Sequence, residues 1–234
     1  MQFRDIFLFI SGFLSYICAV NSHNEHNKLL LISFDGFRWD YLDKVKNSGR
    51  ETPHFDRLIQ TGVKAKWANS VFATVTFPNH FTIVTGMYAE NHGVIGNEMY
   101  DPELNATWDW SKNDVRFYNN GTIGGGAEPI WITNQRAPGT TLFQRCSGVM
   151  AWVGGGVPYG LDQMMPCHWY KYEYNSTSLP DKQRVDTIIN WFTTEDNPIN
   201  LGLLYFPEPD YTGHAVGPNA DLLLDKIVSL DKTL

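Results

Sequence analysis

The sequence predicts an α/β fold with a mostly parallel central sheet flanked by helices. Two apolar runs, at residues 29–34 and 201–206, have the length of buried strands, and segments with helical spacing alternate with them. The 234-residue chain is 43% hydrophobic and 14% aromatic, which is ample for a packed core. Together these observations argue against a disordered chain and fit one large domain or two small ones.

The elements of the first half follow one another in a regular order. The run at 29–34 shows little alternation of apolar and polar residues, so we expect an interior strand covered on both faces. Residues 52–62 have apolar residues at helical spacing and end at a glycine, which predicts a helix. After Thr76, Pro78 fits a first helical turn, and the apolar pattern continues to Gly86. Thr76 is therefore expected at the start of a helix.

The second half alternates irregular and regular segments. Residues 101–129 are polar, aromatic and glycine-rich, which predicts a surface excursion outside the sheet. The glycine run at 154–156 lacks the Gly-Lys-Ser/Thr of a phosphate-binding P-loop. One face of residues 181–192 is apolar, so we expect a helix that packs on the sheet. A last helix is expected to begin near Asn219.

Residues 1–22 are expected to form a secretory signal peptide. Arg4 lies in a short leading region, and the apolar segment from Ile6 to Val20 is shorter than the ~18 uninterrupted residues of a spanning helix. A buried helix or a retained anchor is the alternative interpretation. No other segment is apolar enough to cross a membrane, so any membrane anchor is expected outside this chain.

Sequons and cysteines fit an extracellular location. Three N-glycosylation sequons begin at Asn105, Asn120 and Asn175. Cys146 and Cys167 remain outside the signal, and an even pair in an oxidising compartment favours a disulfide. The alternative is one buried free thiol and one cysteine whose partner lies beyond this chain.

The charge distribution excludes one class of partner. The formal net charge is −7, from 18 basic and 25 acidic residues, and the chain has no cluster of Lys and Arg. A surface for polymeric nucleic acid would need a basic stripe. A nucleotide substrate would therefore be held locally, by metal and by stacking.

Polar residues follow both apolar runs, at the edge where ligands of open α/β sheets bind. Asp35 directly follows the first run, and Asp210 with His214 follows the second. Surrounding prolines and glycines lead us to expect Asp210 and His214 on a turn. On spacing alone, an aspartate after a strand is usually a turn or cap residue. A threonine nucleophile, however, needs a metal or a base beside it, and Thr76 can reach the same edge. The layout predicts a metal-assisted hydrolase.

Four motifs resemble the ectonucleotide pyrophosphatase/phosphodiesterase family of the alkaline-phosphatase-like superfamily. They lie in order at residues 33–38 (SFDGFR), 76–80 (TFPNH), 85–93 (TGMYAENHG) and 209–214 (PDYTGH). Segments 129–135 and 200–205 look most like the small membrane-anchored members of this family. The resemblance implies an alkaline-phosphatase-like fold. It also implies that residues 23–234 are the N-terminal part of a phosphodiesterase catalytic domain.

The resemblance implies a catalytic residue and a cofactor. Thr76 would be the nucleophile that forms a covalent nucleotidyl intermediate, and two Zn²⁺ ions would be bound. Asp35 and Thr76 would hold one ion, and Asp210 and His214 the other. Oxygen donors together with an imidazole suit zinc in an open catalytic site better than Mg²⁺.

The resemblance also implies residues that bind substrate. Asn97 matches a position whose side-chain amide donates to a phosphate oxygen, and Phe77 and Tyr174 match positions whose rings sandwich a nucleotide base. Tyr174 is one of three alternating tyrosines, any of which could be an ordinary strand residue. We expect His80 to be a structural hydrogen-bonding group within its helix, and His92 to brace the loop that follows it.

The sequence departs from the family pattern in two places. Family members continue into a strand that ends in an Asp-His pair, and a later His completes the two zinc sites. The resemblance therefore implies that this chain is incomplete at its C-terminus, with two protein ligands per metal. Residues 153–157 stand where the family usually has a Trp-Pro-Gly-type segment, so the wall on the substrate side is unassigned.

The sequence thus predicts a zinc-dependent enzyme, secreted or on the extracellular face of the plasma membrane, that hydrolyses phosphodiester or pyrophosphate bonds in nucleotides. A choline-phosphate diesterase of the same family is the alternative, and it would need an anionic or aromatic cage for the quaternary ammonium. A secreted fragment that keeps the fold but lacks catalysis is the alternative outside enzymology. We expect this chain by itself to be inactive.

Overall fold

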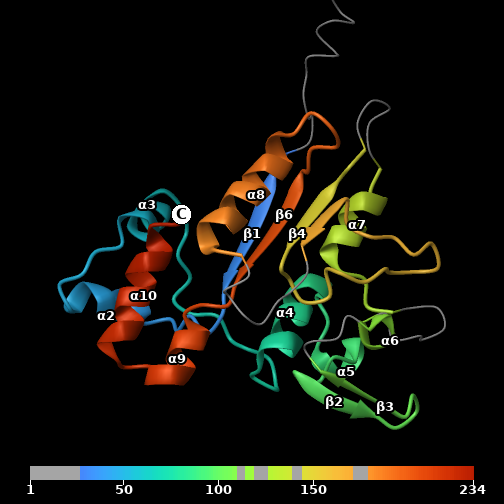
Figure 1. Ribbon diagram of the computed structural model, residues 1–234, viewed down its shortest axis with the longest axis horizontal. Coiled ribbons are helices and arrows are strands. Elements are labelled where there is room, and N and C mark those ends of the chain that lie inside the picture. Colours follow the sequence, from blue (N-terminus) through green and yellow to red (C-terminus); the bar gives the residue numbers. More distant parts are fainter. Residues whose placement is uncertain (1–26, 110–113, 119–125, 139–143, 171–178) are drawn as a thin grey trace, which may run out of the picture.

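The computed structural model describes residues 27–109, 114–118, 126–138, 144–170 and 179–234. The predicted signal, Asn120, Tyr174 and Asn175 lie outside these ranges. At the centre is a four-stranded, fully parallel sheet in the order β1-β6-β4-β5 (Figure 1). Its strands are β1 (Leu29–Phe34), β4 (Ser147–Met150), β5 (His168–Tyr170) and β6 (Leu201–Phe206). The mostly parallel sheet predicted from the sequence is therefore confirmed.

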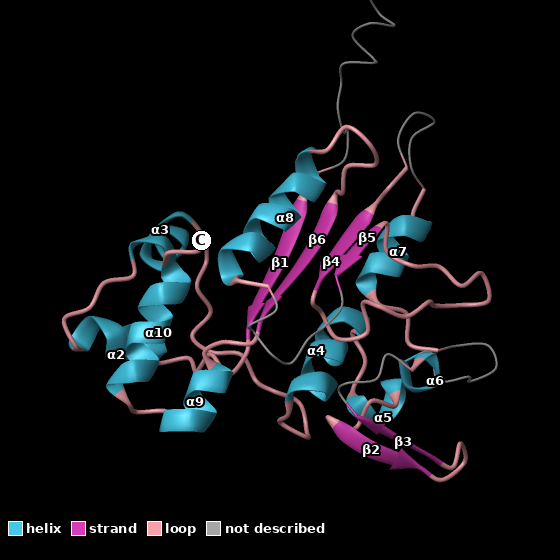
Figure 2. Cartoon of the chain, in the orientation of Figure 1, coloured by secondary structure: helices cyan, strands magenta, loops and turns pink. Residues whose placement is uncertain are grey.

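Helices flank both faces of this sheet, as Figure 2 shows. The helices of the described residues are α2 (Tyr41–Asn47), α3 (Pro53–Thr61), α4 (Thr76–Thr85), α5 (Ala89–His92), α6 (Val115–Tyr118), α7 (Ile130–Arg136), α8 (Asp181–Thr193), α9 (Asp210–Val216) and α10 (Asp221–Asp231). The helices predicted around 52–62, 76–86 and 181–192 are confirmed as α3, α4 and α8. Gly86 ends α4 in the left-handed conformation, with φ of 68°, because glycine adopts it without steric cost.

The two faces of β6 belong to two different hydrophobic clusters. Leu203 and Tyr205 point to the side of α4 and α7, where large aromatic side chains fill the core. Leu204 and Phe206 point to the other side and pack with Ile188 of α8. All six residues of β6 are buried, which is why this strand reads as a continuous apolar run.

The position of β1 differs from the prediction of an interior strand. Among the described strands β1 pairs with β6 alone and lies at the edge of the sheet. Leu29 is 58% exposed and Leu30 39% exposed, and no residue of the strand is fully buried. A continuous apolar run predicts that side chains on both faces of the sheet are covered. It carries no information on whether both backbone edges are paired, and this is why the prediction was wrong.

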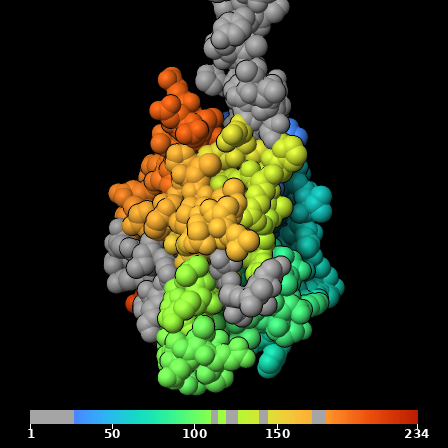
Figure 3. Space-filling model, turned by 90° about the vertical axis from the view of Figure 1, so that its right-hand side faces the viewer, coloured from blue at the N-terminus to red at the C-terminus, as the bar shows by residue number. Residues whose placement is uncertain are grey.

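A small antiparallel hairpin lies outside the main sheet. It consists of β2 (Glu98–Asp101) and β3 (Ala106–Asp109), within the segment predicted as a surface excursion. Figure 3 shows this hairpin in green below residues of the 151–170 segment, which cross the middle of that face. A disulfide joins Cys146, just before β4, to Cys167, just before β5, with the two Cα atoms 5.7 Å apart. It ties the starts of two neighbouring parallel strands together.

The helices beyond β1 form a separate group. Tyr41 and Val45 of α2 pack on Leu223 and Ile227 of α10. At its end α10 carries Asp231, a buried carboxylate that accepts a hydrogen bond of 2.7 Å from the backbone N–H of Phe55 in α3. Within the described ranges, no helix is long and apolar enough to cross a membrane.

Candidate active site

Asp35 and Asp210 meet at the carboxyl ends of β1 and β6. The N–H of Asp35 donates to the carbonyl of Phe206 at 2.9 Å, which continues the pairing of the two strands. The N–H of Asp210 then donates to the carbonyl of Asp35 at 3.0 Å. Because parallel strands end at the same edge of a sheet, residues that are far apart in sequence become neighbours here.

Gly36 permits this close approach. Its φ is +64°, a conformation that glycine adopts without steric cost. A Cβ atom at this position would lie 2.7 Å from the Cα of Asp210 and 2.8 Å from its Oδ1. The chain after β1 therefore needs a glycine for Asp210 to lie against it.

The carboxylate of Asp35 accepts three hydrogen bonds. Its Oδ2 accepts one from Thr76 Oγ1 at 3.1 Å and one from the hydroxyl of Tyr205 at 2.7 Å. Its Oδ1 accepts one from the N–H of Gly36 at 3.0 Å. The structure thus brings the predicted nucleophile into direct contact with the predicted metal ligand beside it.

Thr76 is the first residue of α4, and Asn97 lies beside the same turn. The N–H of Phe77 donates to Asn97 Oδ1 at 2.9 Å, which satisfies one of the unpaired amides at the start of the helix. Since the oxygen of the Asn97 side chain is engaged, its NH₂ group is the part that can donate to a ligand. The helix N-terminus adds a partial positive charge at the same place.

His80 fixes the first turn of α4 from inside the protein. Its Nδ1 lies 2.8 Å from the carbonyl of Thr76, which can only accept, so Nδ1 carries the proton. Its Nε2 therefore accepts from the hydroxyl of Ser33 at 2.8 Å. Burial lowers the pKa of His80, which favours the neutral ring. This is the structural hydrogen-bonding role expected from the sequence.

His92 braces the loop after α5, as the sequence predicted. Its Nδ1 accepts from the N–H of Val94 at 3.1 Å, which leaves Nε2 to donate to Thr82 Oγ1 at 3.0 Å. Burial lowers the pKa of this histidine as well. His92 thus connects α5 and its loop to the outer part of α4.

Asp210 and His214 lie on the helix α9, and the turn predicted for them is wrong. Pro209 occupies the N-cap position and Gly217 the C-cap, so both helix breakers fall outside the helix. Asp210 Oδ2 and His214 Nε2 are 3.3 Å apart, and the His214 side chain is 75% exposed. The two residues border a hollow of about 200 Å³ together with Gly36, Tyr41, Pro209, Gly213 and Pro218.

The start of α9 is held by a buried carboxylate. Glu208 is 5% exposed, and its Oε2 accepts from the N–H of Thr212 at 3.0 Å. Its Oε1 lies 3.4 Å from Lys226 Nζ on α10. Glu208 therefore links the first turn of α9 to the neighbouring helix.

Negative charge accumulates at this edge of the sheet. Burial raises the pKa of Asp210, the charge of Asp35 raises it further, and His214 acts in the opposite direction. No group of three His, Cys, Asp or Glu side chains among the described residues is placed to hold a metal. The carboxylate, hydroxyl and imidazole donors of the two predicted pairs nevertheless suit zinc, and a cation would neutralise the paired carboxylates.

Phe77 and Asn105 are further predicted residues that the structure describes. Phe77 is 2% exposed and packs edge-on against Trp108, with ring centroids 5.3 Å apart. Its ring thus contributes to the core beside the candidate site, and its contact with a base stays a prediction. Asn105 is exposed between β2 and β3, and its Oδ1 accepts from the hydroxyl of Tyr100 at 2.9 Å. Its glycosylation also stays a prediction.

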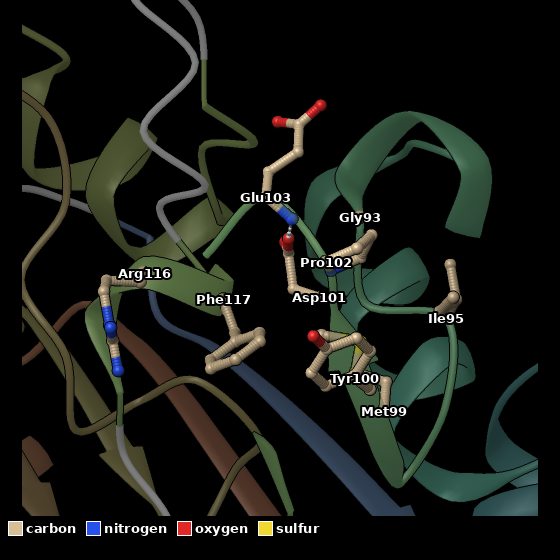
Figure 4. A pocket seen from close by; sticks show the side chains of 9 residues that line it. All are labelled: Gly93, Ile95, Met99, Tyr100, Asp101, Pro102, Glu103, Arg116 and Phe117. Carbon is tan, nitrogen blue, oxygen red and sulfur yellow. Dashed lines mark hydrogen bonds between the residues drawn. The ribbon is translucent and has the colours of Figure 1, made fainter. Parts of the chain in front are cut away.

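A second hollow, of about 260 Å³, lies beside the hairpin (Figure 4). Two of its charged side chains, Asp101 and Arg116, are engaged locally. Asp101 Oδ1 accepts from the N–H groups of Glu103 at 2.8 Å and Leu104 at 3.0 Å, and Arg116 pairs with Asp114. Since Asp101 serves a turn and Arg116 a local ion pair, whereas the predicted site residues meet at the sheet edge, we assign the candidate site to the sheet edge.

Sequence reasoning missed two residues of the candidate site. Tyr205 contacts Asp35 from within an apolar strand, where the sequence pattern indicates only a core residue. Ser33, which donates to His80, belongs to the SFDGFR motif, but the motif alone assigns it no role. The strand pairing of Ser33 with Tyr205 is the signal that would have revealed both.

Comparisons with known proteins agree with this geometry. The family model for type I phosphodiesterase / nucleotide pyrophosphatase matches residues 29–234. The chain is 43% identical to human ectonucleotide pyrophosphatase/phosphodiesterase family member 5 over 226 residues, which cover 97% of this chain and 43% of that protein. It is 36% identical to mouse bis(5'-adenosyl)-triphosphatase enpp4 over 198 residues, which cover 85% of this chain and 39% of that protein.

Solved structures give the same result. Murine family member 5, in an inactive threonine-to-alanine variant in complex with AMP, superposes with a TM-score of 0.76 at 42% identity. The match covers 88% of this chain and 50% of that one. The human member 5 structure superposes with a TM-score of 0.75 at the same identity and the same coverage. The fold is therefore alkaline-phosphatase-like, and the chain spans about half the length of the relatives it matches.

Proposed function

The chain belongs to the type I phosphodiesterase / nucleotide pyrophosphatase family, and from this premise we propose that it contributes the nucleophile half of an enzyme that hydrolyses phosphodiester or pyrophosphate bonds in nucleotides. The observation that carries the proposal is the Asp35 carboxylate, which accepts the hydroxyl hydrogen bond of Thr76 at the start of α4. The AMP complex of murine member 5 and the activity named for enpp4 support a nucleotide substrate.

The chain's own residues suggest a two-step reaction. The phosphate of the substrate lies before the N-terminus of α4, where the amide of Asn97 donates to one of its oxygens. Thr76 Oγ1 attacks phosphorus, the bond from phosphorus to the leaving oxygen breaks, and the hydroxyl proton ends on that oxygen. Water then attacks the phosphothreonine ester, which releases a nucleoside monophosphate and restores the Thr76 hydroxyl. A threonine-to-alanine substitution inactivates murine member 5, which supports a threonine in this role.

Two Zn²⁺ ions suit the donor pairs Asp35 with Thr76 and Asp210 with His214. When bound, they would supply Lewis-acid charge that lowers the pKa of a hydroxyl and neutralises phosphate oxygens. The placement of Asp210 directly beside Asp35, with the N–H of Asp210 donating to the carbonyl of Asp35 at 3.0 Å, is the observation that supports a cation here. Asp35 would keep the Thr76 hydroxyl in place, and His214 would supply an imidazole donor beside the carboxylate of Asp210.

We also propose an extracellular location. The signal-like residues 1–22 and the sequon at the exposed Asn105 support it. The disulfide between Cys146 and Cys167 adds to this support because such bonds persist mainly in oxidising compartments.

Replacement of the nucleophile tests the proposal. In the full-length protein, Thr76→Ala should abolish hydrolysis of a nucleotide diester and leave thermal unfolding unchanged, since the half-buried hydroxyl adds little to the core. Thr85→Ala is the matched control, because Thr85 is on the same helix and its hydroxyl donates to the carbonyl of Phe81. Turnover by Thr76→Ala at the rate of the control would overturn the assignment.

A substrate panel separates nucleotides from choline-phosphate diesters. Tyr174→Ala should weaken a nucleotide substrate by about 1–3 kcal/mol, the usual size of base stacking on an aromatic ring. A small diester without a base should be affected much less. Equal losses for both substrates would mean that Tyr174 is structural, and the nucleotide assignment would lose support against the choline-phosphate alternative. An inactive full-length protein would favour a secreted protein without catalysis.

A further inference from the structure

Tyr205 makes the shortest hydrogen bond to the Asp35 carboxylate, yet the reaction outlined above does not use it. Its hydroxyl donates to Asp35 Oδ2 at 2.7 Å, the same oxygen that accepts the Thr76 hydroxyl at 3.1 Å. A tyrosine hydroxyl that is buried in a hydrophobic core usually has a hydrogen-bond partner. Here the partner is a residue of the candidate site rather than a backbone carbonyl.

The fold fixes the place of this hydroxyl. Tyr205 pairs with Ser33 in the parallel register of β1 and β6, and Asp35 is two residues beyond Ser33, so all three side chains share one face of the sheet. The ring of Tyr205 is 1% exposed and stands edge-on to the His80 ring, with centroids 5.1 Å apart. The tyrosine hydroxyl therefore has little freedom to move away from Asp35.

A buried arginine holds the backbone of the same residue. Arg184 of α8 is fully buried, and its Nη1 donates to the carbonyl of Tyr205 at 3.2 Å. Its Nε donates to the carbonyl of Leu179 at 3.0 Å. Tyr205 is thus held by its ring from one face of the sheet and by its carbonyl from the other.

We propose that Tyr205 is a positioning residue, which orients the Asp35 carboxylate toward Thr76 and toward the metal that these two residues would share. Without the hydroxyl, Oδ2 keeps only the longer bond from Thr76, and the carboxylate is less restrained against rotation about its Cβ–Cγ bond. Asp210 lies next to it and repels it. Hydrogen bonds to a ligating carboxylate commonly decide how well it holds a metal.

The inference rests on the proposed function, and its test includes a measurement that does not depend on turnover. Tyr205→Phe removes the hydroxyl and keeps the ring. Tyr159→Phe is the matched control, since Tyr159 is also 1% exposed and its hydroxyl donates to the carbonyl of Gly154 at 2.8 Å. Both variants lose one buried hydrogen bond, but only the first loses a bond to Asp35.

Zinc affinity of the full-length protein is measured by competition with a chelator, together with kcat/KM for a nucleotide diester and the melting temperature. We expect Tyr205→Phe to lower zinc affinity and kcat/KM by about 10- to 100-fold, and Tyr159→Phe to leave both near the wild-type values. The two variants should lose similar thermal stability. Wild-type zinc affinity and turnover in Tyr205→Phe, or equal losses in both variants, would overturn the inference.

A double variant shows whether the hydroxyl acts through Asp35. In an Asp35→Asn background, Tyr205→Phe should change zinc affinity by less than about 2-fold, because interacting residues are not additive. A full additional loss would mean that Tyr205 supports the fold in general, and it would overturn the inference. If the wild-type protein binds zinc but hydrolyses no nucleotide, the proposed function fails while the comparison of zinc affinities still decides the role of Tyr205.

Discussion

The two halves of the candidate site differ in how the fold holds them. Asp35 and Thr76 lie at the end of a sheet strand and at the start of α4, and three hydrogen bonds fix the Asp35 carboxylate. Asp210 and His214 lie on the short helix α9, where the His214 side chain is 75% exposed. The first half is preorganised by the protein itself, whereas the second depends on the placement of one helix.

The difference extends to charge. Three hydrogen-bond donors compensate the charge of Asp35. Among the described residues Asp210 has no such set of donors, and its pKa is raised by burial and by the charge of Asp35. A cation should therefore contribute most to the stability of the Asp210 half. The comparison indicates that the proposed nucleophile is in position without a metal, and that the α9 half would gain most from a bound cation.

The largest expected effect comes from neutralising one carboxylate in each half. Both Asp35→Asn and Asp210→Asn should lower turnover by about 100- to 1000-fold, as loss of a preorganised charged group does. Their stabilities should differ. Asp35→Asn places an amide NH₂ against either the N–H of Gly36 or the two hydroxyl donors, which should destabilise the metal-free protein by about 1–3 kcal/mol.

Asp210→Asn should instead stabilise the metal-free protein at neutral pH. When folding raises the pKa of a carboxyl group, the protein becomes less stable as the pH rises from the pKa of that group in the unfolded state to its pKa in the folded state. A neutral amide at the same position avoids this loss. Kinetics and thermal unfolding in the presence of a chelator measure both effects. Equal destabilisation by the two substitutions would contradict the contrast between the halves.

The contact between the halves can be broken at Gly36. Gly36→Ala places a side chain at a φ of +64° and brings its Cβ within 2.7 Å of Asp210. Gly49→Ala is the control, because its φ is +78° and a Cβ added there would have no atom within 4 Å. The control should cost about 1–2 kcal/mol for the left-handed backbone. Gly36→Ala should cost about 1–3 kcal/mol more for overpacking.

Denaturant unfolding of both alanine variants checks this prediction. Because the added methyl group displaces Asp210, Gly36→Ala should also lose turnover, whereas Gly49→Ala should retain it. Identical unfolding free energies for the two variants would show that α9 moves away without cost, and that the two halves are not tightly joined.

The smallest expected effect concerns His92, which braces α4, the helix that carries Thr76 in the first half of the site. Burial lowers the pKa of this histidine, so the folded state disfavours its protonated form. Its contribution to stability is present above the unfolded pKa of about 6.5 and is lost as the pH falls toward and through the lowered folded pKa. His92→Asn can still accept from the N–H of Val94 and cannot titrate.

The free energy of unfolding of His92→Asn should therefore fall less steeply with acidification than that of the wild type. Thermal or denaturant unfolding across the acidic range measures the two slopes. Part of the slope should remain, since burial lowers the pKa of His80 in the same direction. Parallel curves for variant and wild type would contradict the role given to His92.

Local sequence patterns were sufficient to predict the strands and the helix that position Asp35 and Thr76. The strands at 29–34 and 201–206 have the predicted bounds, because a continuous apolar run of this length marks a strand whether it lies inside the sheet or at its edge. Thr76 begins α4 as predicted, because Pro78 in the first turn and Gly86 at the end are local signals. Asp35 and Asp210 meet because parallel strands end at one edge.

Features that depend on tertiary pairing were not predictable from such patterns. The hydroxyl of Tyr205 reaches Asp35 only through the register of β6 with β1, which an apolar run does not specify. The helix α9 was missed because Pro209 and Gly217 read as helix breakers, although here they occupy its two caps. The edge position of β1 was missed because side-chain coverage and backbone pairing are separate properties.

During protein synthesis, β1 cannot pair with β6 until the ribosome has made β6. Leu29 pairs with Leu201, and among the described strands β1 has no earlier partner. At the usual rate of about 5–20 residues per second, the ribosome needs roughly 10–30 s to make the intervening chain. Within the described residues, β1 therefore has no strand to pair with until β6 has been made. The apolar side chains of segment 29–34 are therefore available to a chaperone before their partner strand exists.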